Sequence, residues 1–241
     1  MHRVWLPIFV LASVFSRWPC LEFTFAEDVG SKHSSGLDEK AAKGALEAAK
    51  KALNVLKSSQ FTQTDEDRVH LKELGFESAD DVANADLGSP LQVYKIVLTS
   101  GKGRKGLIDF QRGDDPEQLL IDTPRTVIYP VVVKTKGVRS SLTVSEFDKD
   151  KGWHATQRGS PNFIRKLEDY REQKPSVDRI VWIPGLNLIF LGSRTAGQLR
   201  LIAVADNPTI KLKAGEERSA HDVFVQLASE ARKVLDKGGL R

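Results

Sequence analysis

Residues 177–191 read VDRIVWIPGLNLIFL, and this stretch decides the class of fold. Two apolar runs, Val177 to Ile183 and Leu186 to Leu191, are separated only by a Pro-Gly pair, which favours a turn. Strands joined by so short a turn pair antiparallel. Within them, Ile180 to Ile183 and Leu188 to Leu191 are entirely apolar, so we expect these two segments to be buried on both faces, with Ile183 and Phe190 in the core.

Strand patterns continue on both sides of this hairpin. Val138 to Phe147 alternates between apolar and polar residues, and a turn rich in Asp and Lys returns the chain into Trp153 to Arg158. Pro130 within the run Thr126 to Val133 indicates an edge strand or a bulge. The remaining expected elements are strands at Leu91 to Leu98 and Leu199 to Ala205, a helix that begins at Pro161, and a helix from the Ser219 cap to about Asp236.

Helical spacing dominates the chain before these strands. Leu37 to Lys57 carries an apolar stripe at 3-4-3 spacing, and a shorter helix from Asp65 to Leu74 follows a Thr64 cap and ends at Gly75. The stripe suits a coiled-coil seam, but two heptads are too short to stand alone, so we expect this helix to pack on the body of the protein.

The order of these elements predicts an α+β fold, with a mostly antiparallel sheet covered by helices and an N-terminal helical arm. We expect four segments along the 241 residues: a signal peptide at 1–26, a flexible linker at 27–36, the helical arm at 37–86 and the α+β domain at 87–241. Two blocks of strands followed by a helix suggest a duplication, which residue identities do not support.

The N-terminus predicts export. Val4 to Phe15 is an apolar run behind Arg3, and Arg17 ends it well short of the roughly 20 residues of a membrane span. Small residues at Thr24 and Ala26 suit cleavage after Ala26, which places the mature chain in the periplasm or outside the cell without a transmembrane anchor. The rival interpretation is an N-terminal core helix.

Cys20 raises the alternative of a lipoprotein, but Arg17, Trp18 and Pro19 do not provide the small residue that should precede a lipidated cysteine. Cleavage after Ala26 removes this single cysteine, so disulfides and thiolate chemistry are not expected. The formal net charge of +4 is too mild to predict a nucleic-acid partner.

The residues around each possible catalytic or cofactor motif do not match those that the corresponding site requires. Gly101, Gly103 and Gly106 match G-x-G-x-x-G, but the strand-like residues 107–110 follow where a dinucleotide site needs a helix, so we expect a mobile hairpin loop. Ser193 lies outside a nucleophile elbow. No histidine lies in an H-E-x-x-H frame, and no pair of histidines has zinc spacing, so we expect neither metal nor cofactor.

A polar face of the hairpin from 138 to 158 is the candidate binding site. If Trp153 and Ala155 pack beside Leu142 and Val144, the opposite sides of the two strands coincide. Two arginines among hydroxyl groups suit a carboxylate or a phosphate. The alternative is an ordinary solvated sheet face, and a one-residue slip in register would scatter the set. The six candidate ligand-binding residues are Arg139, Ser141, Thr143, His154, Thr156 and Arg158.

Four stretches, Leu87 to Tyr94, Asp122 to Pro130, Arg139 to Val144 and Ile183 to Gly192, resemble a family of uncharacterised exported bacterial α+β proteins. The resemblance runs from about residue 87 to the C-terminus and implies no activity. We therefore expect an exported non-catalytic protein that binds another protein or an envelope component. The alternative is a hydrolase whose site is assembled only in the fold, which a deep pocket with converging Ser, His and acidic groups would support.

Overall fold

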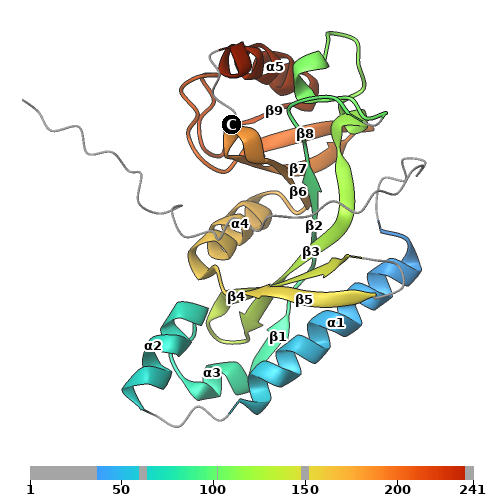
Figure 1. Ribbon diagram of the computed structural model, residues 1–241. Helices are drawn as coiled ribbons and strands as arrows, with labels where there is room; N and C mark the ends of the chain where they lie inside the picture. Colours follow the sequence, from blue (N-terminus) through green and yellow to red (C-terminus); the bar gives the residue numbers. More distant parts are fainter. Residues whose placement is uncertain (1–36, 60–63, 102, 148–151, 237–241) are drawn as a thin grey trace, which may run out of the picture. The chain divides into compact units, whose positions relative to one another are not determined.

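The computed structural model describes residues 37–59, 64–101, 103–147 and 152–236 (Figure 1). The predicted signal peptide and linker lie outside the described residues. Among the helices that are described, none combines the length and the apolar character needed to cross a membrane.

In the described part of the chain, nine strands form a mixed sheet in the order β5-β4-β3-β2-β6-β7-β8-β9, with β1 beside β3. Neighbouring strands are antiparallel except β2 and β6, which are parallel. With its helices, this sheet confirms the predicted α+β class. The strands are β1 (Ala85–Leu87), β2 (Leu91–Lys95), β3 (Ile121–Val133), β4 (Gly137–Glu146), β5 (Trp153–Arg158), β6 (Val177–Ile183), β7 (Leu188–Thr195), β8 (Gln198–Ala203) and β9 (Glu217–Ser219).

The parallel pair β2–β6 lies between two similar halves. In each half, four successive antiparallel strands lead into a helix, α4 (Pro161–Gln173) after β5 and α5 (Ala220–Asp236) after β9. In β6, Ile180 packs in the cluster that contains α4, whereas Val181 packs in the cluster that contains α5. The two helices therefore cover opposite faces (Figure 1), as a two-fold axis along the central strands would place them. Ile183 and Phe190 are both buried, as predicted.

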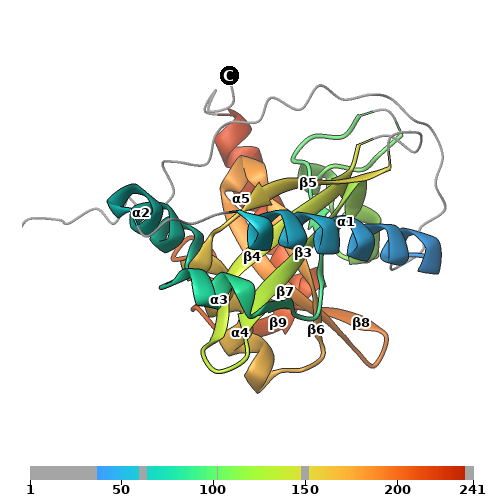
Figure 2. The ribbon, with the colours of Figure 1, turned by 90° about the horizontal axis from the view of Figure 1, so that it is seen from below.

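The N-terminal helices pack on the sheet and do not stand apart. They are α1 (Glu39–Ser58), α2 (Asp65–Leu74) and α3 (Ala79–Ala83). The Asp38 side chain accepts a hydrogen bond from Ala41 N at 2.7 Å and begins α1. Ala45 and Ala49 allow α1 to lie close to Val127, Tyr129 and Val144, and α1 runs along β4 and β5 (Figure 2). The expectation that this helix packs on the body is confirmed.

Pro130 lies inside the sheet. Of the two predicted positions, an edge strand or a bulge, the edge is wrong, whereas the β3–β4 ladder does have an irregularity directly after Pro130, between Val131 and Val132. Strand β3 pairs with β4 on one side and with both β1 and β2 on the other. Pro130 falls opposite the break between β1 and β2, where its carbonyl accepts from Gly88 N at 2.7 Å. The missing proline N–H therefore interrupts no ladder, because β1 and β2 leave a gap at that point.

Two predicted strand segments contain 3-10 turns. Residues 107–110, which the sequence suggested were strand-like, begin with the 3-10 helix η1 (Leu107–Asp109), whose Leu107 is buried. The turn η3 (Pro184–Leu186) and the left-handed Asn187, with φ of 50°, delay β7 until Leu188. Strand β2 also ends at Lys95, three residues earlier than predicted.

Candidate functional site

The β4–β5 ladder determines which candidate residues share a face. Ala155 lies opposite Val144, and Trp153 lies opposite Glu146. Directly opposed residues of an antiparallel ladder present their side chains on one face. Because Val144 packs with two alanines of α1, Trp153 and Ala155 belong to the face that α1 covers.

A β-bulge divides the six candidates. Strand β5 carries one extra residue, Thr156, relative to β4. His154 and Thr143 lie on the face turned away from α1, whereas Arg158, opposite Leu142, lies on the α1 face. The predicted grouping of Arg158 with His154 and Thr143 is wrong, because the bulge inverts the alternation of side chains after it.

Arg139 points into a different part of the molecule. It is the extra residue of β4 at an irregularity of the neighbouring β3–β4 ladder, and its Nη1 is 3.2 Å from Oε1 of Glu77. Its side chain is only 18% exposed, and its Nε has no hydrogen-bond partner among the described residues. Arg139 therefore contributes to an ion-pair network with the segment between α2 and α3, and not to a surface on β4 and β5.

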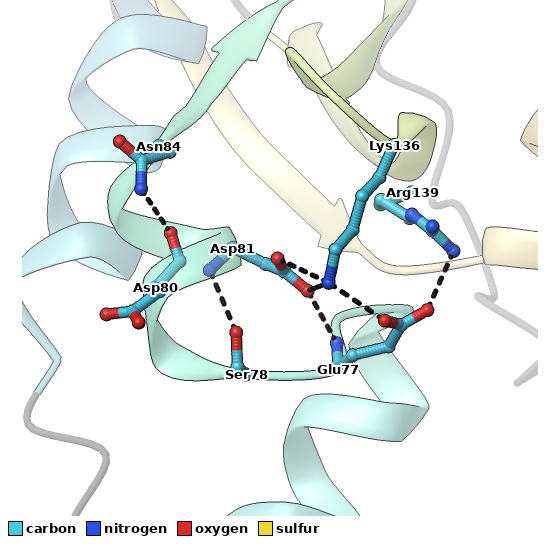
Figure 3. Close-up of polar contacts among 7 residues, drawn as sticks. All are labelled: Glu77, Ser78, Asp80, Asp81, Asn84, Lys136 and Arg139. Carbon is cyan, nitrogen blue, oxygen red and sulfur yellow. Dashed lines mark hydrogen bonds and ion pairs between the residues drawn. The ribbon is translucent and has the colours of Figure 1, made fainter.

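We call this network the Asp81 cluster; it comprises Glu77, Asp81, Lys136 and Arg139 (Figure 3). Lys136 Nζ lies 3.0 Å from Asp81 Oδ1 and 2.8 Å from Glu77 Oε2. Asp81 Oδ2 also accepts a hydrogen bond from Glu77 N at 3.0 Å. The cluster joins α3 to the turn between β3 and β4, which is a structural role.

Protonation states in the Asp81 cluster favour the ion pairs. Burial raises the pKa of Asp81, but hydrogen bonds from Lys136 and from Glu77 N outweigh it, so the pKa lies below its ordinary value. Hydrogen bonds from Lys136 to both carboxylates raise the pKa of that amine. Asp81 and Lys136 are therefore both charged at neutral pH.

Ser141 is also withdrawn from the surface. It is 6% exposed, and its hydroxyl donates a hydrogen bond to the carbonyl of Gly159. Thr143 is half-buried. The structure thus leaves three of the six candidates exposed, His154, Thr156 and Arg158, and all three lie on β5.

Strand β5 forms one edge of the sheet. No described strand pairs with its outer side, and its five residues from His154 to Arg158 are exposed. Gly159 N donates to Ser141 O at 3.0 Å, so the N–H and C=O of the preceding Arg158 point away from β4. This edge presents backbone donors and acceptors on which another extended chain can pair.

Helix α1 supports β5 from below. A Cβ atom added to Gly44 would lie 2.7 Å from Cδ1 of Trp153, so the indole rests directly on the helix backbone at this glycine. Lys40 and Lys51 lie four residues before and seven residues after Gly44, on the same side of the helix, and both are exposed. Strand β5 and this side of α1 therefore form one continuous surface.

A second polar cluster lies in the middle of the sheet, around Arg179, which is 4% exposed. Its guanidinium donates to both carboxylate oxygens of Asp178 at 2.7 and 2.9 Å, and its Cζ lies 5.5 Å from the ring centre of Tyr94. Its Nη1 also lies 3.9 Å from Glu117, in the 3-10 helix η2 (Pro116–Leu119). Burial raises the pKa of Tyr94 to about 12.

The Arg179 cluster ties η2 to β6. Sequence reasoning missed it, although a charged pair inside the apolar run from Val177 to Ile183 was a usable signal, because a buried arginine requires partners. A Cβ on the opposed Gly192 would lie 2.7 Å from Cγ of Arg179, so this glycine leaves the space for the arginine side chain.

The serine, glycine and metal-ligand motifs considered in the sequence form no catalytic, cofactor or metal site among the described residues. Ser193 is 3% exposed within the sheet. A Cβ on Gly106 would lie 2.3 Å from the carbonyl carbon of Thr99, so this glycine permits close backbone packing and is followed only by the short η1. Within the described ranges, no three His, Cys, Asp or Glu side chains come close enough to hold a metal ion.

A hollow of about 400 Å³ lies over α2. Its lining side chains are all exposed, and all come from one helix: Asp65, Glu66, Val69, His70 and Glu73. It is an open surface feature and lacks the converging serine, histidine and acid that would support the hydrolase alternative.

No family model, no curated protein and no solved structure matches the chain. The resemblance to exported bacterial proteins therefore stays a prediction, and function must be argued from the geometry of β5.

Proposed function

We propose that this protein is an exported, non-catalytic binding protein that takes an extended segment of a protein partner onto the edge of β5. The observation that carries the proposal is the open edge itself: β5 is the last strand of the sheet, its residues from His154 onward are exposed, and the backbone of Arg158 points outward. Export follows from the signal peptide expected at residues 1–26, which places the partner in the periplasm or outside the cell.

Strand addition is a common mode of protein recognition. Main-chain hydrogen bonds supply affinity, and the side chains on alternate positions supply specificity. Strand β5 has two features that restrict pairing to a chosen partner, the bulge at Thr156 and the charge of Arg158. Helix α1 holds this edge in place, because Trp153, the first residue of β5, packs directly against the helix at Gly44.

A selection of displayed random nonapeptides on the purified exported protein tests this proposal. We expect enrichment of extended peptides on the wild type and on Arg158→Gln, which keeps the outward N–H. Arg158→Pro should lose the enrichment, because proline removes that N–H but no bond to β4. Circular dichroism melts of both variants establish that they remain folded. Equal enrichment on Arg158→Pro, or no enrichment on the wild type, would contradict the proposal.

A further inference from the structure

We infer that the segment bound by β5 is acidic, with carboxylate side chains at alternate positions on the side of α1. This inference rests on the proposed function and specifies the chemistry of the partner. It follows from the charges that line the α1 side of the open edge.

Three cations lie on that side. Arg158 lies on the α1 face because it is opposed to Leu142, which packs with the C-terminal half of α1. Lys40 and Lys51 lie on the side of α1 that carries Gly44 and therefore faces Trp153. All three side chains are exposed, and none forms an ion pair with any residue that the structure describes.

The remaining charges on this surface are few. Strand β5 contains no acidic residue. Glu146, opposite Trp153 on the α1 face, is paired with Arg125 at 2.6 Å, and Glu47, one turn before Lys51, is the acidic residue on this side of α1. Val55 is 46% exposed and follows Lys51 by one turn, so it offers an apolar contact beside the cations. A strand added to β5 would place every second side chain near Lys40, Lys51 and Arg158. These cations attract carboxylate side chains and repel lysine side chains at those positions.

The same charges argue against a second copy of the chain as the occupant. Antiparallel pairing of β5 with β5 of another copy would bring the two cationic rows of Lys40, Lys51 and Arg158 to the same side of one sheet. Like charges brought together in this way destabilise the pairing. An acidic partner has no such penalty and gains from charge attraction.

Two synthetic peptides test the inference. One has the sequence Thr-Val-Glu-Val-Glu-Val-Glu-Val-Thr, and the other replaces each Glu by Lys; fluorescence anisotropy measures their Kd on the purified exported protein. Three exposed charge pairs predict that the acidic peptide binds about tenfold more tightly in low salt. This preference should vanish in 0.5 M NaCl and should reverse in the double variant Lys40→Glu, Lys51→Glu.

The outcomes separate the inference from the proposed function. Equal binding of both peptides, or tighter binding of the lysine peptide, overturns the inference and leaves strand addition intact. Binding of neither peptide overturns both. Analytical ultracentrifugation without peptide checks self-association, and a dimer that excludes the peptide assigns the edge to a second copy and overturns the inference. A folded double variant that keeps the wild-type preference also overturns it, because the lysines would then not contact the peptide.

Discussion

Replacing Gly44 by alanine tests whether α1 lies against β5. In a helix interior this change ordinarily stabilises a protein by about 1 kcal/mol, because glycine is a poor helix former. Here the new Cβ would lie 2.7 Å from Cδ1 and 3.2 Å from Nε1 of Trp153. Overpacking of this kind costs about 1–3 kcal/mol. Because Trp153 is only half-buried and has room to shift, we expect a net loss of about 0–1 kcal/mol for Gly44→Ala.

The assay is urea unfolding of Gly44→Ala in the wild type and in Trp153→Ala. Removal of the indole removes the clash, so Gly44→Ala should then stabilise the protein by about 1 kcal/mol. The coupling energy of the cycle should be about 1–2 kcal/mol. Ala42→Gly, at an exposed position of the same helix, is the control for helix propensity and should cost about 1 kcal/mol. Equal stabilisation by Gly44→Ala in both backgrounds would refute the contact between α1 and β5.

Four further predictions follow from burial, charge and sequence. Phe190→Ala should lower the free energy of unfolding by about 3–5 kcal/mol because Phe190 is 2% exposed, whereas Phe147→Ala, at 47% exposed, should cost less than about 1 kcal/mol; similar losses in urea unfolding would contradict the assigned core. Burial raises the pKa of Tyr94 to about 12, so the unfolded chain ionises first and the protein should lose up to about 3 kcal/mol as pH rises from 10 to 12. Tyr94→Phe should remove that part of the alkaline loss, and identical pH profiles would show that the tyrosine is not buried. The pKa of Asp81 is lowered, so its contribution is present above its ordinary value of 3.8 and is lost at more acid pH; Asp81→Asn should reduce stability at pH 7 by about 1–3 kcal/mol and weaken the acid dependence, whereas unchanged thermal melts at pH 7 would argue against the cluster. N-terminal sequencing of the exported protein should begin at Glu27, and a product that keeps the apolar leader would contradict the cleavage prediction.

Hydrophobic periodicity was enough to predict the class of fold and most elements. The hairpin from Val177 to Leu191 and the caps at Thr64 and Ser219 are local signals, and the structure has each of them. The parallel pairing of β2 with β6 was not predictable in this way, because these strands lie far apart in the chain and periodicity does not identify the neighbours of a strand.

The candidate site depended on register, which is harder to predict. Trp153, Ala155 and Val144 share one face, as the expected packing required, but bulges at Thr156 and near Arg139 changed the direction of both arginines. A bulge can be recognised in a sequence where it breaks the alternation of apolar and polar residues. Residues 154–158 of β5 are all exposed and have no such alternation, so the sequence alone did not reveal the bulge at Thr156. What survives is the part of the prediction that needs no register, namely three exposed polar residues on β5.

Residue-resolved amide hydrogen exchange, measured by NMR with and without the acidic peptide, tests the central claim most directly. If the peptide adds a strand to the sheet, the outward N–H of Arg158 becomes hydrogen-bonded on binding. We predict that its exchange slows at least tenfold while the exchange of residues in the buried strand β7 stays unchanged. A peptide that binds with no slowing at Arg158, or anywhere else along β5, would contradict the account.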